Sequence, residues 1–598
     1  MNIKLSKSDM ISYVGDILPL SLEGDGVDRY SKVTFSVCGN AVALRTFERD
    51  KEHSAGNCVL VLFMSPGDAV IQAEYNGQIY KTSVKVRPIS HVSSEDAVNY
   101  YFADMHAHTS PIHNHDLFAK HEQEDITDYI DFIKNDPLDL SVISDHAGVT
   151  NDHDFFRGFA LAENCPSTVI LAGAESEVKF TELDRFGILH RHSGEILTFM
   201  SKGYGKVDTW EELEREIDGS PAPIAIFAHP NIVGFSTNGM WNFDFFRHAS
   251  PTMLNAIRGI EAIDGGDKDE FLAYEYCYSA ALDAGFRVSP TADLDSHGPV
   301  WGYDAMIPKT IIMAKENSKE AFHDALRSCR FYCTESGNVK LSYSVNNKTA
   351  PADLTPTSQY RFEVKVDTFK DDSASLPVLC QVISDYGKTV AEYPVTGKAF
   401  EIDLTSDSAR YFYLRLTDSK GRHTWSCPVW CGRPFDTLSN NELEPIDMSD
   451  AKAFCDGVRA NKLICGDPTD SYHCGQPRPT IVIDLGKEKE ISGFGYFPHI
   501  IMRNPEKGPQ WRTSHESRNI VSHYKLYSSV DGESYTLLSE KYCQYLGDEN
   551  VIEFPERTAR YIKMEVLSTV GANSGQTDMT DCQALIGELS LFRSKNNP

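Results

Sequence analysis

Short runs in which apolar and polar residues alternate dominate the first 97 residues of the chain. Residues 32–37 (KVTFSV), 58–63 (CVLVLF) and 82–87 (TSVKVR) are examples, and turns rich in Gly, Asn and Asp separate them. Alternation with a period of two puts every second side chain on the same face of a strand. The pattern therefore predicts an all-β sandwich over residues 1–97.

The pattern changes at Tyr101, where compact apolar runs begin to alternate with segments of helical period. The expected strands are residues 138–143, 168–171, 224–227 and 259–263. The expected helices are residues 125–135, 209–217, 270–284 and 318–328. Strands that alternate with helices predict a parallel sheet, either open or closed into a barrel, over residues 98–335.

The helical period disappears again after about residue 335. Short apolar runs then predict a second, Ig-like β-sandwich over residues 336–436. Residues 437–448 are polar and contain a proline, which is typical of a linker. The remainder, residues 449–598, predicts a third β-rich unit.

Composition and charge limit the classes of function. Of the 598 residues, 41% are hydrophobic and 24% are charged, which fits several folded domains. The formal net charge of −29, without any Lys/Arg block, argues against nucleic acid as a partner. No run of 18 apolar residues occurs, and Ser12, Gly15 and Asp16 interrupt the apolar residues near the start. We therefore expect a cytoplasmic protein that has no membrane segment.

Side chains of the metal-ligand type follow the strands expected in residues 98–335. The first of these strands ends with His106 and His108, which share a face because they lie two positions apart. Later runs are followed by the remaining candidates: Asp145 and His146, Glu175, His229, and Asp295 with His297. Parallel strands bring their carboxyl ends to one edge of a sheet, so these side chains are expected to share one pocket.

Each of these groups alone is commonly a turn, a cap or a solvated residue. Their recurrence at the end of strand after strand is what indicates a metal site. Imidazole and carboxylate ligands without thiolate suit Zn, Mn or Fe, and the sequence does not choose among these metals.

This ordered set, His106-x-His108, Asp145-His146, Glu175, His229 and Asp295-x-His297, resembles the signature of the polymerase-and-histidinol-phosphatase (PHP) family. The resemblance covers about residues 99–335. It implies a distorted (β/α)7 barrel with two or three divalent metal ions at the strand ends. The ligands it implies are His106, His108, His146, Glu175, His229, Asp295 and His297.

The family pattern implies two further ligands. One follows the HxH pair closely; His113 is nearest to that position, and the alternatives are His115 and Asp116. The other is a histidine between the glutamate and the His-Pro element, for which His190 is favoured over His192. Asp295 is favoured over Asp293, which is expected to lie behind the ligands.

Metals held in this way lower the pKa of a trapped water and polarise the scissile group, so a hydrolase is expected. The resemblance favours a phosphoesterase, with a sugar-linked phosphate as a candidate substrate and with Arg191 and His190 as candidate catalytic residues. One alternative is a metal-dependent carbamate, ester or amide hydrolase. Another is a non-catalytic carbohydrate-binding scaffold. Walker, G-x-S-x-G and dinucleotide motifs do not occur in the sequence.

The last unit contains five strand-like elements, residues 480–486, 491–498, 524–532, 559–566 and 586–592. In this order they resemble the discoidin or coagulation-factor type C module, a jelly roll that often binds sugars, over about residues 449–595. Trp511, Arg512 and His515 are candidate sugar-binding residues, although an architectural role is an equal alternative. The expected fold class is multidomain: a (β/α)7 PHP barrel flanked by β-sandwich domains, with a C-terminal β jelly roll.

Overall fold

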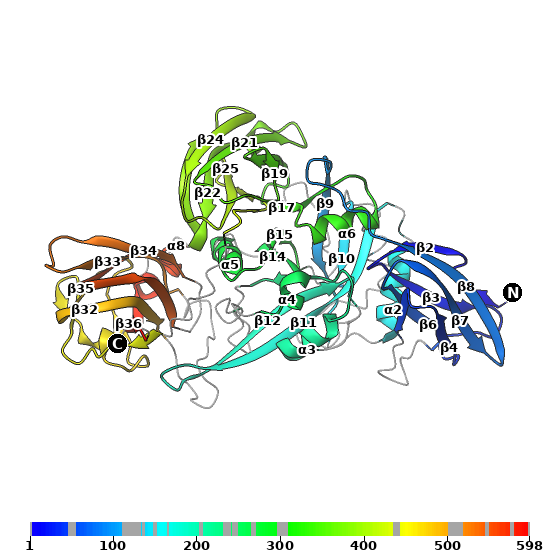
Figure 1. Cartoon of the computed structure of the whole chain (residues 1–598), viewed down its shortest axis with the longest axis horizontal. Coiled ribbons are helices and arrows are strands. Elements are labelled where there is room, and N and C mark those ends of the chain that lie inside the picture. Colours follow the sequence, from blue (N-terminus) through cyan, green and yellow to red (C-terminus); the bar gives the residue numbers. More distant parts are fainter. Residues whose placement is uncertain are drawn as a thin grey trace.

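The computed structural model of the chain contains four units, arranged as Figure 1 shows: the N-terminal sandwich at the right, a second sandwich at the top, a central unit below it, and the C-terminal unit at the left. The residues that the structure describes are 3–45, 56–109, 129, 133, 138–147, 152–163, 165, 167–201, 207–230, 241, 249–264, 271–295, 309–433, 443–499, 518–543, 549–573 and 579–595.

The N-terminal unit consists of two four-stranded sheets that face each other. One has the order β1-β3-β6-β5 and the other β2-β8-β7-β4. The strands are β1 Lys4–Leu5, β2 Met10–Tyr13, β3 Ile17–Glu23, β4 Thr34–Cys38, β5 Val42–Arg45, β6 Cys58–Phe63, β7 Gly67–Tyr75 and β8 Gln78–Arg87. Their inward aliphatic residues, such as Leu20, Val61 and Ile71, form one buried core. The unit therefore occupies the range in which the alternating pattern predicts a sandwich.

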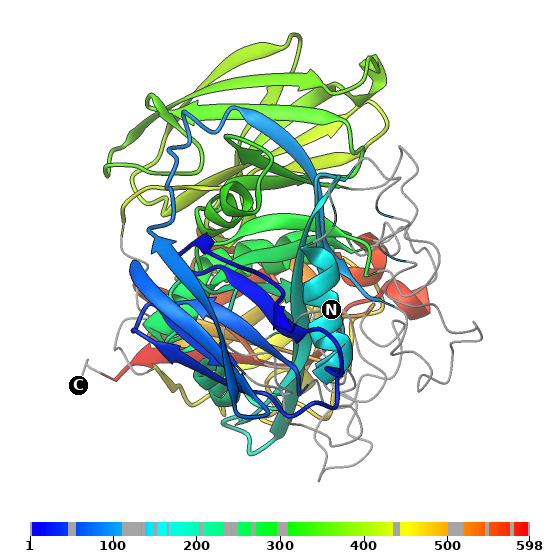
Figure 2. The same ribbon diagram turned by 90° about the vertical axis from the view of Figure 1, so that its right-hand side faces the viewer.

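A partly buried lysine joins the N-terminal sandwich to the central unit. Lys319 Nζ lies 2.8 Å from Asp16 Oδ1 and 3.0 Å from Glu163 Oε1. Lys7, from the sandwich, lies 3.0 Å from the other oxygen of Glu163. Figure 2 shows the two units against each other, with the sandwich in front. Only Asp16 is buried, and the other three members are partly exposed, so the network helps to hold the two units together.

The central unit is built on one mixed sheet. Its strands are β9 Asn99–Ala107, β10 Leu140–Ile143, β11 Val169–Leu183, β12 Leu189–Phe199, β13 Ile224–Ala228, β14 Ile257–Asp264, β15 Ser289–Asp293, β16 Lys309–Ala314 and β17 Phe331–Thr334. They lie in the order β15-β14-β13-β12-β11-β10-β9-β16-β17. Two parallel sets, β9-β10-β11 and β13-β14-β15, flank the antiparallel strand β12.

Short helices cover this sheet. They are α2 Asp152–Ala162, α3 Trp210–Ile217, α4 Pro251–Ala256, α5 Phe271–Asp283 and α6 Lys319–Arg327. The side-chain oxygens of Thr209, Ser250 and Ser318 accept backbone hydrogen bonds at the starts of α3, α4 and α6, as N-caps do. Helices α3, α5 and α6 confirm the helices predicted at 209–217, 270–284 and 318–328. The expected helix 125–135 lies almost entirely outside the described residues.

The (β/α)7 barrel expected for residues 98–335 is wrong. Such a barrel needs parallel strands that are each followed by a helix. Here β11 and β12 form a long antiparallel hairpin joined by the turn 184–188, and β9 pairs antiparallel with β16. The described helices of the unit span only 6 to 13 residues. Strand predominates, and the sheet continues beyond the unit instead of closing on itself as a parallel barrel.

The second sandwich shares this sheet. Its strands are β18 Val339–Val345, β19 Lys348–Thr349, β20 Ala352–Asp353, β21 Gln359–Thr368, β22 Pro377–Ser384, β23 Lys388–Pro394, β24 Ala399–Thr405, β25 Tyr411–Asp418, β26 His423–Trp425 and β27 Val429–Trp430. One layer, β19-β18-β21-β24, is separate, whereas β26-β25-β22-β23 continues the central sheet through the pair β17·β26. A boundary at residue 335 therefore divides the sequence but not the hydrogen-bonded sheet.

The C-terminal unit is a nine-stranded antiparallel assembly with its own core. Its elements are β28 Leu443–Pro445, β29 Lys452–Cys455, β30 Val458–Arg459, β31 Tyr472–His473, β32 Thr480–Pro498, β33 Val521–Ser529, β34 Thr536–Tyr542, β35 Asn550–Thr569, α8 Val570–Asn573, α9 Met579–Cys582 and β36 Leu585–Ser594. The unit begins before residue 449, because β28 pairs with β36. Part of the predicted linker 437–448 is thus a strand. Among the described residues, no helix is long and apolar enough to cross a membrane.

The tip of the β11–β12 hairpin touches the C-terminal unit. Arg185 in the hairpin turn donates to both carboxylate oxygens of Glu549 at 2.6 Å. The next residue, Phe186, packs edge-on against Phe497 with the ring centroids 5.5 Å apart. Figure 1 shows the hairpin reaching from the central unit towards this contact. The hairpin therefore connects the interior of one unit with the surface of another.

Candidate metal centre

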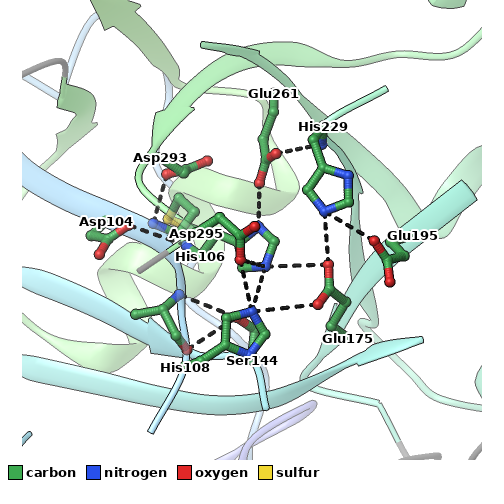
Figure 3. A network of polar contacts seen from close by, with 12 residues as sticks. Asp104, His106, His108, Ser144, Glu175, Glu195, His229, Glu261, Asp293 and Asp295 are labelled. Carbon is green, nitrogen blue, oxygen red and sulfur yellow. Dashed lines mark hydrogen bonds and ion pairs between the residues drawn. The ribbon is translucent and has the colours of Figure 1, made fainter. Parts of the chain in front are cut away.

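Neighbouring strands of the central sheet deliver polar side chains to one place (Figure 3). Each residue is located by its strand: His106 near the end of β9 and His108 just after it, His146 after β10, Glu175 within β11, Glu195 within β12, His229 after β13, Glu261 within β14, and Asp295 after β15. The parallel strands present their carboxyl ends here. Strand β12 runs the other way and presents its middle, with Glu195 opposite Ala228.

Four of these residues form a tight group. His106 Nε2 lies 3.0 Å from His108 Nε2, and both lie close to the Asp295 carboxylate, at 3.3 and 3.0 Å. Glu175 contacts His106 Nε2 at 3.3 Å through one oxygen and His108 Nε2 at 3.4 Å through the other. One ligand atom from each of the four residues lies within 4.8 Å of the others. His106, His108 and Glu175 are completely or almost completely buried.

A second group shares Glu175. His146 Nδ1 lies 3.0 Å from Glu175 Oε2, and His229 Nε2 lies 3.2 Å from Glu175 Oε1. His229 Nε2 is also 3.2 Å from Glu195 Oε2. The ligand atoms of His146, Glu175 and Glu195 again lie within 4.8 Å of one another. Glu175 therefore stands between two sets of candidate ligands.

The exposure of the side chains falls in one direction across the site. Those of His106 and His108 are fully buried, whereas those of Asp295, His146 and Glu195 are 22%, 32% and 32% exposed. The histidine pair thus forms the floor. Solvent reaches the site from the side of the three partly exposed residues.

Further acidic groups lie behind this floor. Asp293 Oδ1 accepts a hydrogen bond from the Met105 backbone N–H at 2.7 Å. Asp145 accepts hydrogen bonds from the backbone N–H and the hydroxyl of Thr109, at 2.6 and 2.5 Å. These contacts fix the chain on both sides of the histidine pair. Asp145, expected beside His146, thus holds the backbone after His108.

Two residues at the site have unusual backbone conformations. His229 has φ of 23° and Asp295 has φ of 46°, values that side chains with a Cβ rarely adopt. Strain of this kind persists only where the surroundings impose it, and it is concentrated at functional positions. Both residues lie just beyond a strand end and direct their side chains to the common centre (Figure 3).

The charges of the floor perturb one another. Burial alone would lower the pKa of His106, but Glu175, Glu261 and Asp295 outweigh it and raise that pKa well above its ordinary value. Burial lowers the pKa of His108 to about 3, so that ring is neutral. Burial would raise the pKa of Asp295, yet the two histidines hold it well below its ordinary value. One positive charge is therefore stabilised between the histidine pair and the carboxylates.

The outer group shows the same opposition. Burial opposes protonation of His146 and His229, but Glu175 overcomes it and raises their pKa values to about 9 and about 10. Burial and repulsion from Glu175 raise the pKa of Glu195 to about 7. The histidines in turn hold the pKa of Glu175 well below its ordinary value, against burial. The outer group thus also favours bound positive charge.

The structure brings together most, but not all, of the residues predicted from the sequence. His106, His108, His146, Glu175, His229 and Asp295 converge. His113, with the alternatives His115 and Asp116, lies outside the described residues, as does His297. The backbones of His190 and Arg191 pair with Glu182 and Thr181 near the hairpin tip. The side chains of residues 190–192 lie outside the described part, so their proposed roles stay predictions.

Two functional carboxylates escape the sequence analysis. The prediction placed a histidine between Glu175 and His229, but the described side chain that reaches the site from β12 is that of Glu195. Glu261 was missed because it lies in the middle of β14 and not at its end. A signal for it exists: it is a lone acid inside the apolar run 259–263. A buried charge in such a run needs a partner.

Comparisons with known proteins concern only part of the chain. No family model and no curated protein matches the sequence. Similar solved structures include CpGH89CBM32-5 from Clostridium perfringens in complex with GalNAc-β-1,3-galactose, at 20% identity over 25% of this chain and 100% of that one, with a TM-score of 0.20. Another is the family 32 carbohydrate-binding module of Clostridium perfringens NanJ in complex with galactose, at 17% identity over 25% and 99%, with a TM-score of 0.20.

A third solved structure is the C-terminal domain of a chitobiase from Bacteroides fragilis, at 17% identity over 25% of this chain and 97% of that one, with a TM-score of 0.19. Each of the three matches about a quarter of the chain. Two of them are named as carbohydrate-binding modules. None of them supports the PHP resemblance of residues 98–335.

Proposed function

We propose that the central unit binds divalent cations and uses them to hydrolyse a substrate, with a phosphoric ester as the first candidate bond. One observation supports this proposal above the others: buried ligand atoms of His106, His108, Glu175 and Asp295 lie within 4.8 Å of one another. The strands that carry them are far apart in the sequence. Buried like-charged and lone-pair-bearing groups are costly to assemble unless a positive charge joins them.

The protonation of the histidine floor fits a cation. His106 Nδ1 faces a Glu261 oxygen at 2.7 Å, so this nitrogen carries a proton and Nε2 is the ligand atom. Nε2 in turn faces oxygens of Glu175 and Asp295, both at 3.3 Å. In the metal-free chain a proton on Nε2 meets these oxygens, and a cation would take the place of that proton. Nitrogen and oxygen donors without sulfur suit Zn, Mn or Fe.

Two cations are the natural number for this arrangement. His106, His108, Glu175 and Asp295 would hold one, and His146, Glu175 and Glu195 would hold the other, with Glu175 common to both. His229 lies between them, in contact with both glutamates. Cations held there would polarise the scissile group and lower the pKa of water at the site.

The chain itself orients the reaction. Because Asp295, His146 and Glu195 are partly exposed and the histidine floor is buried, the substrate meets the outer three residues first. The same geometry also suits a carbamate, ester or amide bond, which is the alternative.

Metal analysis and chromogenic assays test this proposal. The full chain is stripped with a chelator, reloaded with Zn²⁺, Mn²⁺ or Fe²⁺, and its metal content is measured by mass spectrometry. Turnover is then followed with nitrophenyl phosphate, bis-nitrophenyl phosphate and nitrophenyl acetate. We expect about two equivalents of metal and release of nitrophenol from a phosphate ester. Release from the acetate alone would favour the alternative, and a folded chain that takes up no metal would contradict the proposal.

For the C-terminal unit we propose carbohydrate binding, as a second function. The five elements in discoidin-like order support it, and the solved structures named above contain galactose and GalNAc-β-1,3-galactose. These sugars are therefore the first probes for calorimetric titration of the full chain. Binding that glucose does not reproduce would agree with the proposal. Absence of heat with either sugar at millimolar concentration would contradict it for this ligand class.

A further inference from the structure

A fully buried glutamate lies in the middle of a central strand, directly behind the candidate metal centre. Glu261 belongs to β14 and has no exposed surface. Its neighbours on the strand, Ile260, Ala262 and Ile263, are equally buried and apolar. A carboxylate in such surroundings is unfavourable unless both of its oxygens find donors.

Both oxygens of Glu261 do find donors, and both donors belong to candidate ligand residues (Figure 3). Oε1 lies 2.7 Å from His106 Nδ1. Oε2 accepts a hydrogen bond from the backbone N–H of His229. One carboxylate thus holds the ring of one histidine and the backbone of another. The second of these is the residue whose φ of 23° is unusual for a side chain with a Cβ.

We infer that Glu261 is a positioning residue of the metal centre: its carboxylate keeps the proton of His106 on Nδ1 and anchors the turn that carries His229. The inference rests on the proposed function of the central unit. With the proton on Nδ1, the lone pair of Nε2 points to the place where Glu175 and Asp295 converge. Residues that orient ligands in this way commonly set metal affinity.

The charge of Glu261 matters as much as its size. The backbone N–H of His229 is always a donor, so it needs an oxygen opposite it. A glutamine has one acceptor oxygen and one NH2 donor group. If its oxygen serves His229, its NH2 group faces His106 Nδ1. His106 must then accept at Nδ1 and carry its proton on Nε2, where the proton would block the ligand position.

Glu261→Gln therefore separates positioning from packing, because the two side chains have nearly the same shape. We expect the variant to bind Zn²⁺ about ten- to a hundredfold more weakly than the wild type in calorimetric titration of the metal-free full chain. In ¹⁵N-histidine-labelled metal-free protein, long-range nitrogen–proton spectra should show that His106 of the variant has lost its Nδ1 proton and keeps one on Nε2. His106→Gln identifies the signals.

Glu275→Gln is the matched control. Glu275 is also buried, at 2% exposure, and accepts hydrogen bonds from Tyr413 and Arg415 at 3.0 and 2.6 Å, away from the histidines. Its loss should lower the thermal unfolding midpoint and leave the Zn²⁺ affinity within about twofold. A purely structural role for Glu261 predicts the same result for both variants.

The outcomes distinguish this inference from the proposed function. A folded Glu261→Gln chain with wild-type Zn²⁺ affinity and an unchanged His106 tautomer would overturn the inference and leave the metal site intact. A wild-type chain that binds no Zn²⁺, Mn²⁺ or Fe²⁺ would overturn the proposed function. In that case the Nδ1 proton of His106 in the metal-free wild type still decides the role of Glu261: a proton on Nδ1 that the variant loses supports it, and an Nδ1 without a proton in the wild type overturns it.

Discussion

Gly194 lies where a strand of the candidate metal centre passes under a buried tryptophan. On β12 it pairs with Val178 of β11 and directly precedes Glu195. A Cβ atom added at Gly194 would stand 2.1 Å from Cε2 and 2.3 Å from Cδ2 of Trp241. Ordinary contact begins at 3.4 Å. In Gly194→Ala the indole or the strand must therefore move by at least about 1.3 Å, because carbon atoms repel steeply below contact distance.

The indole has little room to move. Trp241 is 1% exposed, packs edge-on against Phe227 with the ring centroids 5.0 Å apart, and donates through Nε1 to the Glu195 carbonyl oxygen at 3.2 Å. Overpacking of such a site typically costs about 1–3 kcal/mol of unfolding free energy. We expect Gly194→Ala to cost that amount. It should also weaken cation binding, because Glu195 follows on the same strand.

A double-mutant cycle with Trp241→Ala gives the critical measurement. Trp241→Ala alone should cost about 3–5 kcal/mol through the cavity it leaves. In the double variant the added methyl group meets no indole, so its cost should fall to about zero, a coupling of about 1–3 kcal/mol. Pulse proteolysis across a urea series gives the folded fraction of each chain. Costs that add within about 0.5 kcal/mol would refute the steric reasoning.

Three further variants test other contacts. His108→Ala should abolish turnover and reduce the bound metal measured by mass spectrometry. The control His473→Ala replaces an exposed histidine of β31 and should change neither. Equal metal content in both variants would contradict the ligand role of His108. Burial would raise the pKa of Glu163, but the neighbouring lysines, chiefly Lys319, lower it below the ordinary value of 4.5. The ionised carboxylate therefore stabilises the fold above pH 4.5, and this stabilisation is lost as the pH falls through the lowered pKa. Thermal midpoints of Glu163→Gln should therefore decline less between about pH 6 and pH 3.5 than those of the wild type, and parallel curves would contradict this. Arg185→Ala removes a partly exposed ion pair with Glu549 that is worth about 0.5–1 kcal/mol. Amide exchange at the hairpin tip should therefore accelerate about two- to fivefold, while exchange in β9 stays unchanged as the internal reference.

The convergence of the histidines could be predicted because it follows from local geometry. His106, on β9, and His108, directly after it, lie two positions apart, so they face the same side whatever the rest of the sheet does. His229 follows the end of β13, where the apolar run 224–227 stops, and Asp295 lies two residues after the end of β15. Short-range periodicity is sufficient for such positions. It does not depend on how the strands are joined.

The barrel was predicted wrongly because hydrophobic runs underestimate strands that project from the core. The expected strand 168–171 is the start of β11, which continues to Leu183. Its outer part contains Glu177, Lys179 and Thr181, and it pairs with the equally polar start of β12. A two-stranded ribbon that lies away from the core needs no apolar face, so its sequence has no hydrophobic pattern that would predict a strand. The reversal of direction at residues 184–188, which turns a parallel sheet into a mixed one, was missed with it.

Glu195 escaped prediction for a related reason. The prediction searched the residues that follow apolar runs, which is correct for strands that all point the same way. Because β12 is antiparallel to β13, its apolar run 196–199 leads away from the site, and the ligand precedes the run. Only knowledge of strand direction, which is a tertiary property, would have directed attention to Glu195.

The β11–β12 hairpin couples the central unit mechanically to the C-terminal unit. Its base supplies Glu175 and Glu195 to the candidate site, and its tip contacts the C-terminal unit through Arg185 and Phe186. A hydrogen-bonded ladder of eleven residue pairs, from Gly173 to Leu183 on β11, joins base and tip. The C-terminal unit is therefore unable to rotate away from the central unit while these contacts at the hairpin tip are intact. A hinge motion there would first have to break the contact at the tip of the hairpin that carries Glu175 and Glu195.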